Sequence, residues 1–456
     1  MSTGGLERRL SFPPFFRKEK GPSPEQELFE RTLKGYRAWN VREKGSIIDF
    51  DLTAGPDDFE EVTRGFSHEA TPEDRSFMVS FLGRLLERID ETLPGSKENH
   101  PHLEFMRARV EASLWFAMRL MGEEMDPLIY LEKTNGVRIE PAVEKTLLIP
   151  LRDKLFAMAN QNGIPIQDPE TYLAWRLEKQ KGPNTTWDLV VDAIDKSLVA
   201  IGEFIDEPCQ LGYEVNQVDE EKYYYAWSRT NYQTQVFTLD LNFNETKIWT
   251  PGKSEELGVH EGGEHLRRMN EWRQQIRKGK MPAVIGQTVV HGPEAVVEEG
   301  LALTIAHYVP KIYEGLSTEG QFQVDASILR HLVYGNVSIM LNKSPKRPPI
   351  KRASQYIHKF IPWEPQSEID LQIKWRTQDP TYQAYLPAYA FGARMFLEII
   401  ETLSERGRKQ LLKDLSLRPY TPEQLMNRVA ELQNGKKNRN ESQTSVTSPS
   451  NVQALA

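Results

Sequence analysis

Cysteine is almost absent from this 456-residue chain. Cys209 is the single cysteine, so no internal disulfide can form, and no second thiol is available to share a metal ion. This usage is typical of a reducing compartment, and we expect a cytoplasmic protein with a structural cysteine. The first 21 residues also lack the apolar run of roughly 7–15 residues that a secretory signal peptide needs.

Long apolar runs and an excess of basic charge are missing as well. The stretch LALTIAHYV (301–309) is far shorter than the roughly 20 residues of a membrane-spanning helix, so we expect no membrane partner. The chain has 57 basic and 65 acidic residues, with a formal net charge of -8. This balance gives no field that attracts phosphate backbones, which excludes nucleic acid as an expected partner. The oligomeric state is not determined by these features.

The apolar content is sufficient for a sizeable core, since 39% of the residues are hydrophobic and the mean hydropathy is -0.56. The two ends differ from the rest: 1–22 is rich in Pro, Gly and charge, and 434–456 is polar. We predict that both ends are disordered. Between them we expect a helical N-terminal region over 23–200 and a second region, over 201–433, that holds the candidate site.

Four predicted helix starts share one signature. A capping residue is followed by Pro and then by acidic residues or Gln, and it stands at Ser23, Thr71, Asp168 and Thr421. The side-chain oxygen of the first residue accepts a hydrogen bond from an otherwise unpaired N–H, and Pro has no N–H to leave unpaired. After the second start, the apolar residues recur with a spacing of four, which predicts one buried helical face over Phe77, Phe81, Leu85 and Ile89.

The pattern changes in the middle of the chain. Aromatic and apolar residues alternate over 222–228 and 235–242, and this period of two predicts strands. We expect them to form a small antiparallel β patch at about 203–250, with helices returning over about 254–433. The predicted fold class is therefore mainly α, a large multi-helix fold with a small antiparallel patch near the middle of the chain.

The segment that follows the patch carries His260-Glu261-Gly262-Gly263-Glu264-His265. Imidazole and carboxylate groups suit zinc, and a helical H-E-x-x-H motif places two histidines four residues apart on one face. Here His260 and His265 are five apart. On an ideal helix that spacing sets them about 140° apart around the axis, so a regular helix does not direct both at one ion.

Two arrangements bring a pair of ligands together. A π-type turn at Gly262 and Gly263 returns positions i and i+5 to one face, and glycine makes such a distortion inexpensive. Alternatively, regular i, i+4 pairs join His260 with Glu264, or Glu261 with His265. A charged, solvated turn is the third reading, but two glycines within a helix cost roughly 1 kcal/mol each relative to Ala, which argues for a compensating role.

A third ligand is available downstream in HGPEAVVEEGLALTIAHYV (291–309). Pro293 is expected at the first helical position, and four apolar residues are expected to face the core: Val297, Leu301, Ile305 and Tyr308. Glu299 on this helix follows His265 by 34 residues (299 − 265) and can reach a metal held by the first helix. Read alone, the acids at 294–299 also fit a solvated helix N-terminus.

Three short blocks resemble the successive motifs of a large, mostly uncharacterised bacterial family of zinc-metallopeptidase-like proteins. These are WTPGKSEELGVHEGGEHL (249–266), EEGLAL (298–303) and YAFG (389–392), against H-E-x-x-P-G-H, E-G-W-A and Y-x-x-G. That family is of the glutamate-zincin type, with a helical fold similar to carboxypeptidase Taq. The similarity covers roughly 120–430 and is specific only in these blocks. The spacing between the two histidines is one residue shorter here.

The resemblance implies that His260, His265 and Glu299 are zinc ligands and that Glu261 is the general base. It also implies that Tyr389 stabilises the oxyanion; Tyr385, one helical turn earlier, is a second phenol suited to this role. The expected function is a zinc-dependent hydrolase of peptide or related amide bonds, with Zn²⁺ as the cofactor and a peptide or small amide as the substrate.

Other readings stay open at this point. A catalytically silent member of the same fold, acting as a binding or scaffold protein, is the main alternative. A helical protein that binds iron or manganese through His260 and Glu264 is another. His307, eight residues after Glu299, suits a role behind the metal ligands, and Arg394 suits a substrate carboxylate. The remaining histidines, including His331, have no partner at ligand spacing.

Overall fold

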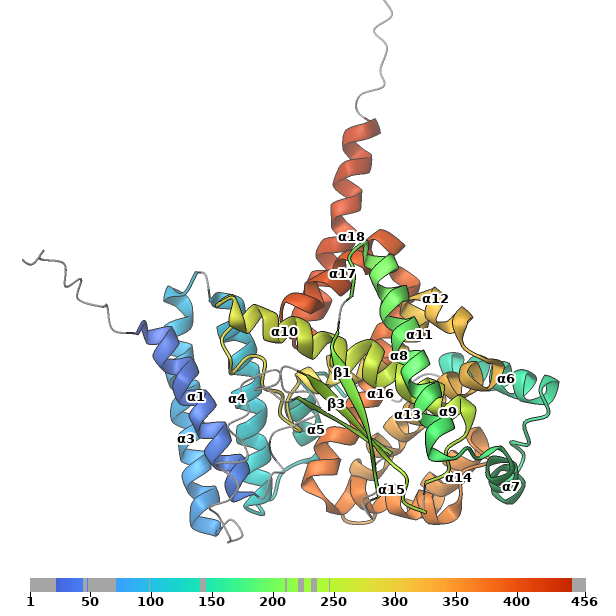
Figure 1. Ribbon diagram of the computed structural model, residues 1–456. Coiled ribbons are helices and arrows are strands. Elements are labelled where there is room, and N and C mark those ends of the chain that lie inside the picture. The colour runs from blue at the N-terminus through green and yellow to red at the C-terminus, as the bar shows by residue number, and fades with distance from the viewer. Residues whose placement is uncertain are drawn as a thin grey trace, which may run out of the picture.

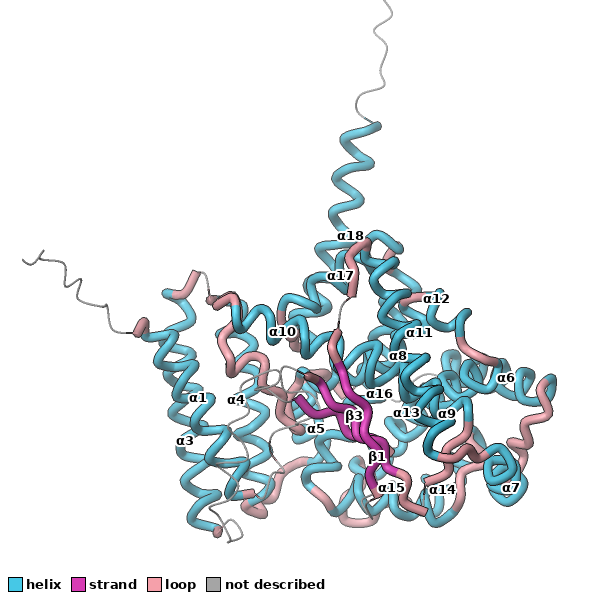
Figure 2. The backbone as a smooth tube through the Cα atoms, viewed as in Figure 1, coloured by secondary structure: helices cyan, strands magenta, loops and turns pink. Residues whose placement is uncertain are grey.

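The computed structural model describes residues 22–43, 47, 71–97, 99–139, 145–209, 211–219, 225–230, 236–245 and 247–444. The protein is mainly α, as predicted, with a small sheet near its centre (Figures 1 and 2). Residues 1–21 and 445–456, where disorder is expected, lie outside the described residues. The last helix, α18 (Pro422–Thr444), continues past residue 434 into the expected tail and projects from the body.

Helices form the N-terminal part of the chain. In order they are α1 (Pro24–Arg42), α3 (Pro72–Thr92), the short 3₁₀ helix η2 (Leu93–Gly95), α4 (His100–Leu120), α5 (Pro127–Asn135), α6 (Lys145–Gln161), α7 (Pro169–Lys179) and α8 (Pro183–Ile205). The helices α1, α3 and α4 lie side by side at one end of the molecule (Figure 1). The expected boundary at residue 200 falls inside α8.

The four predicted helix starts are confirmed. Thr71 forms a capping box with Asp74, and the side chains of Ser23, Asp168 and Thr421 accept hydrogen bonds from the first turns of α1, α7 and α18. The predicted face of α3 is wrong by one position at its start. Phe77 is 59% exposed, and the buried residues are Met78, Leu82, Leu85 and Ile89, because a spacing of four drifts around a helix of 3.6 residues per turn.

The predicted antiparallel patch is a mixed sheet in the structure. Its strands are β1 (Tyr213–Val218), β2 (Ala226–Thr230) and β3 (Phe237–Asn242), in the order β1-β3-β2. The β2–β3 pair is antiparallel, as expected, but β1 pairs with β3 in parallel. The sequence pattern does not give the direction of pairing, because alternation identifies a strand but not its partner, and the partner depends on the path of the chain between the strands. Residues 222–224 of the expected first strand lie outside the described residues.

The remaining elements are helical and follow the sheet. They are α9 (Pro251–His260), the π-helix η3 (Glu261–Leu266), α10 (Arg267–Arg277), α11 (Glu294–Tyr308), α12 (Pro310–Gly315), α13 (Thr318–Asn342), α14 (Ile350–Phe360), α15 (Gln366–Gln378), α16 (Pro380–Thr402) and α17 (Glu405–Leu417). None of the described helices combines the length and apolar character that a membrane crossing requires.

Three clusters of buried apolar side chains pack these helices and strands against one another. The largest joins residues of α6 and α8 to residues of α11, α13 and α16–α18. A second lies between α1, α3 and α4 and reaches Trp272 and Val289 in and after α10. The third packs the sheet on α8, α9 and α10. The segment 251–277 therefore touches all three clusters, which fixes it firmly at the centre of the molecule.

Candidate metal centre

The histidine motif lies in a π-helical turn. The element η3 spans Glu261–Leu266 and joins α9 to α10 without a break in the helical path. A π-turn closes i→i+5 contacts, so positions five apart return to the same face. His260 and His265 consequently point the same way, and of the arrangements considered from the sequence it is the π-turn that the chain adopts.

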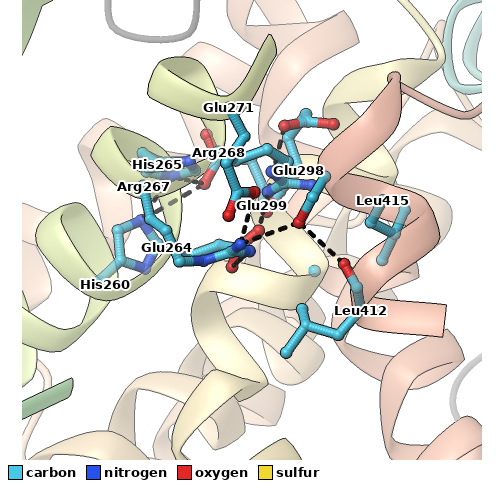
Figure 3. A network of polar contacts seen from close by, with 12 residues as sticks. His260, Glu264, His265, Arg267, Arg268, Glu271, Glu298, Glu299, Leu412 and Leu415 are labelled. Carbon is cyan, nitrogen blue, oxygen red and sulfur yellow. Dashed lines mark hydrogen bonds and ion pairs between the residues drawn. The ribbon is translucent and has the colours of Figure 1, made fainter. Parts of the chain in front are cut away.

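Three donor atoms converge beside this turn (Figure 3). The Nε2 atoms of His260 and His265 lie 3.1 Å apart. The Oε2 atom of Glu299, on α11, lies 3.5 Å from each of them. Within the described part of the chain, this His260–His265–Glu299 group is the one cluster of potential metal ligands, with all its donor atoms within 4.8 Å of one another. The sequence-predicted ligands are thus brought together.

The spacing of the donors suits a small cation. Zinc binds imidazole nitrogen and carboxylate oxygen at about 2.0–2.2 Å, so neighbouring donors of a tetrahedral site are about 3.4 Å apart. The observed separations of 3.1 and 3.5 Å match that value. The Oε2 atom of Glu299 is buried and has no hydrogen-bond partner among the described residues. With two imidazole nitrogens at 3.5 Å and no hydrogen bond from the described residues, this buried oxygen would gain further compensation from a cation held between the three atoms.

The electrostatics of the three side chains are coupled. Burial alone disfavours the charged form of Glu299, but the imidazoles of His265 and His260 outweigh it and hold the pKa of this carboxyl below its usual range. Burial lowers the pKa of His260, while Glu299 and the nearby carboxylates of Glu261 and Glu256 outweigh it and raise the pKa overall. Together, these interactions favour an ionised Glu299 carboxylate facing the two imidazoles.

The two glycines have a packing role in addition to their conformational freedom. Gly262 faces Ile194 of α8 so closely that a Cβ atom at this position would overlap the isoleucine side chain. A Cβ atom at Gly263 would lie 3.0 Å from Ser197 Cβ. A side chain at position 262 would push the π-turn away from α8, so glycine lets the two elements lie in direct contact.

Glu264 is not part of the candidate centre. It is fully buried and forms ion pairs with Arg267 at 3.0 Å and with Arg268 at 2.5 Å. Burial opposes its ionisation, but the two arginines outweigh burial and lower the pKa of Glu264. Glu264 is therefore not paired with His260 as a metal ligand, because its carboxylate is directed at arginines (Figure 3).

The acids at the start of α11 are buried rather than solvated. Glu294 pairs with Arg109 at 2.7 Å, and Glu298 lies 3.1 Å from Arg268. Burial raises the pKa of Glu298 to about 8, with Arg268 opposing the shift. The exposed fractions of Glu294, Glu298 and Glu299 are 0%, 1% and 2%, so the solvated-face reading is wrong. The helix begins at Glu294, with Pro293 as its N-cap, one residue later than expected.

Two tyrosines of α16 extend the centre. The Tyr385 hydroxyl donates a 2.5 Å hydrogen bond to Oε1 of Glu299, and the Tyr389 hydroxyl donates to Tyr385 at 3.3 Å. Tyr385 is therefore the phenol in contact with the ligand set, and Tyr389 lies one hydrogen bond behind it. Gly300 and Gly392 explain this closeness: their backbones touch, and a Cβ atom on either residue would collide with the opposite helix.

The other residues that the sequence singled out lie as follows. Glu261 follows His260 directly and is half-buried. His307 lies 2.8 Å from a carboxylate oxygen of the buried Asp325, so its partner is a carboxylate of α13 rather than a metal ligand. Arg394 is half-buried on α16.

A small pocket adjoins His260 and is lined mainly by apolar side chains: Val259, Ala302, Leu303, Ala306 and Val324, with Glu256 and Ser327.

His331 is the residue that the sequence reasoning missed. It lies on α13 and stacks on the Tyr389 ring, with centroids 4.5 Å apart and an interplanar angle of 16°. Because no spacing rule links residue 331 to residues 260 or 299, its proximity arises only from the packing of α13 on α9 and α16.

Comparisons with known proteins give information about the fold but not about the activity. No sequence-family profile matches the chain, and no curated protein matches it. The chain is similar in structure to a candidate lipoprotein from Colwellia psychrerythraea, with a TM-score of 0.53, 12% sequence identity, and coverage of 80% of this chain and 71% of that chain. At this identity the similarity concerns the fold alone.

Proposed function

We propose that this protein is a zinc-dependent hydrolase of peptide or related amide bonds. One observation carries the proposal: a π-turn brings two imidazole nitrogens and a buried carboxylate oxygen into a triangle whose sides suit zinc. The resemblance of the three sequence blocks to the glutamate-zincin type supports the same reading. Both histidines come from one helical path, and the glutamate comes from a second helix, as that resemblance implies.

In this proposal His260, His265 and Glu299 hold the ion. Bound zinc would polarise the scissile carbonyl and lower the pKa of a water molecule towards neutrality. Glu261 is the proposed general base, which takes a proton from the attacking water and delivers it to the leaving amine. Glu261 directly follows His260, is half-buried, and its charge raises the pKa of His260.

The two phenols have separate proposed roles. Tyr385 donates to Oε1 of Glu299, which orients the carboxylate so that Oε2 faces the imidazoles. Tyr389 is the proposed donor to the oxyanion that develops on the substrate carbonyl. Tyr389 has a single hydroxyl hydrogen, which is directed at Tyr385, and in this proposal it turns from Tyr385 to the oxyanion when the substrate reacts.

The pocket beside His260 is small and mostly aliphatic, with Ala302 and Ala306 of α11 in its lining. Glu256, its acidic member, pairs with Lys253 at 2.6 Å, so its charge is already compensated. The single cysteine favours a cytoplasmic location for this activity.

Metal content and turnover test the proposal together. Protein purified without added metal is expected to carry close to one zinc per chain by elemental analysis, and the double variant His260→Ala, His265→Ala is expected to carry very little. Glu261→Gln should keep the zinc and lose hydrolysis of a peptide library, because it removes the base and leaves the ligands in place. Glu314→Gln, the same change at an exposed glutamate of α12, serves as the control.

The outcomes separate the competing readings. Zinc content near zero in both the wild type and the double variant removes the hydrolase proposal. Bound zinc without hydrolysis of any peptide in the wild type favours the catalytically silent binding or scaffold protein. Activity retained in Glu261→Gln means that another group is the base.

A further inference from the structure

A histidine outside the ligand set is connected to the candidate metal centre through two tyrosines. His331 stacks face to face on Tyr389, with ring centroids 4.5 Å apart. Tyr389 donates to Tyr385, and Tyr385 donates to Glu299. The path from the imidazole of His331 to a proposed metal ligand therefore consists of one ring stack and two hydrogen bonds.

The backbone packing of α13 on α16 fixes the stack. Gly335 lies one helical turn after His331, and Ala390 directly follows Tyr389. A Cβ atom at Gly335 would overlap the Ala390 side chain, so the two helices are in close contact beside the rings. Neither helix can shift along the other here without losing this fit, and the relative position of the two rings is set by it.

The surroundings of His331 keep its imidazole uncharged. Burial first, and then the neighbouring guanidinium groups of Arg330 and Arg376, hold the pKa of His331 well below its usual range, with Glu299 acting in the opposite sense. A neutral ring adds no positive charge beside a site that must attract a cation. It also offers Tyr389 a flat, apolar face of matching size, which favours an offset stack.

We propose that His331 is a positioning residue of the candidate centre, whose ring face holds the Tyr389 phenol in line with Tyr385 and the Glu299 carboxylate. The inference rests on the proposed function and adds a residue to it. It assigns His331 a role through its shape rather than through proton transfer. The Tyr389 hydroxyl donates a long hydrogen bond, of 3.3 Å, to Tyr385, and the ring stack adds a second restraint on the direction of the phenol.

Two substitutions separate ring shape from ring chemistry. His331→Phe keeps a flat ring and removes both nitrogens, whereas His331→Leu keeps an apolar side chain and removes the flat face. His358→Leu, at a histidine of α14 that contacts Gln366, is the control. Each variant is measured for zinc content, for kcat and KM on peptides, and for the visible spectrum of Co²⁺ added in place of zinc, which reports on the ligand geometry without turnover.

The expected result is a near-normal His331→Phe and an altered His331→Leu. In the leucine variant kcat should fall roughly 10-fold with KM nearly unchanged, because a misplaced donor weakens transition-state contacts more than substrate binding. The Co²⁺ spectrum should shift in the same variant, because Tyr389 and Tyr385 no longer hold Glu299 in place. Zinc content should remain close to one per chain in all three variants.

Three outcomes overturn the inference. In the first outcome, His331→Leu leaves kcat and the Co²⁺ spectrum unchanged, and turnover still depends on Glu261. This result contradicts the role of His331 and leaves the hydrolase proposal intact. A phenylalanine variant as impaired as the leucine variant shows that a ring nitrogen is required, so the stacking role is wrong. A wild-type protein that binds neither zinc nor Co²⁺ overturns the proposed function and this inference with it.

Discussion

His260 Nε2 lies 3.1 Å from His265 Nε2, although the two residues are five positions apart in one continuous helical path. In a regular helix they would diverge by about 140°. The π-turn from Glu261 to Leu266 removes this divergence, and the contact of its glycines with α8 keeps it in place. The five-residue spacing between the histidines is thus compatible with both imidazoles binding one metal ion.

The first prediction concerns Gly262. In Gly262→Ala the new methyl group collides with Ile194, so we expect a loss of about 1–3 kcal/mol of stability from overpacking and a lower zinc content, because η3 must move away from α8. Urea unfolding and elemental analysis measure the two effects. Adding Ile194→Ala makes room for the methyl group and should recover most of the zinc. No recovery in the double variant would show that the backbone freedom of Gly262, rather than the close packing, is what matters.

The second prediction separates the two tyrosines. Tyr385→Phe removes the donor to Glu299, so zinc affinity should fall about 10–100-fold, measured by competition with a chelator. Tyr389→Phe should leave zinc affinity close to normal and lower kcat by about 10²-fold, the usual effect of losing an oxyanion donor. If both variants change the same quantity to the same extent, the division of roles between the phenols is wrong.

The third prediction concerns the buried ion pairs behind the histidines. Arg268→Met keeps the volume but removes one of the two positive charges on Glu264, and it leaves Glu298 without its arginine. We expect a loss of roughly 3 kcal/mol of stability, because a buried carboxylate loses compensation. Arg88→Met is the matched control, since the Arg88–Glu91 pair is 64% exposed on both sides and should change stability by less than about 0.5 kcal/mol. Equal effects in the two variants would contradict the prediction.

The fourth prediction concerns His291, whose ring stacks on Phe116 at 4.2 Å and accepts or donates a 2.8 Å hydrogen bond with Ser113. Burial first, and then Arg109, lower the pKa of His291 to about 3. The folded protein therefore keeps this ring neutral, while the unfolded chain binds a proton below its ordinary pKa of about 6.5. The folded state loses stability as the pH falls from about 6.5 towards 3, with a slope of up to about 1.4 kcal/mol per pH unit.

The quantity to measure is the slope of folding stability against pH. Urea midpoints between pH 7.5 and 4.5 should decline less steeply in His291→Gln than in the wild type, whatever the offset between the two proteins at neutral pH. His100→Gln, at a histidine of α4 that is 40% exposed, is the control for the substitution itself. A parallel decline in His291→Gln and the wild type would mean that His291 is not kept neutral in the fold.

Local chemistry predicted the elements well. The capped, Pro-led helix starts at Thr71 and Asp168 are where the structure has them, because capping depends on residues within one turn. Alternation identified β3 for the same reason. The parallel pairing of β1 with β3 and the burial of Glu294 were not predictable, since each depends on a partner far away in the chain.

The sequence by itself determined the mainly helical class and the helix starts, because these follow from residue type and short-range spacing, and its resemblance to the glutamate-zincin type implied His260, His265 and Glu299 as candidate ligands. Only the tertiary structure decided that the π-turn forms, that Tyr385 contacts Glu299, and that His331 stacks on Tyr389. These outcomes depend on close contacts between helices, at Gly262 with Ile194, at Gly300 with Gly392 and at Gly335 with Ala390, and such contacts join residues that no local pattern relates.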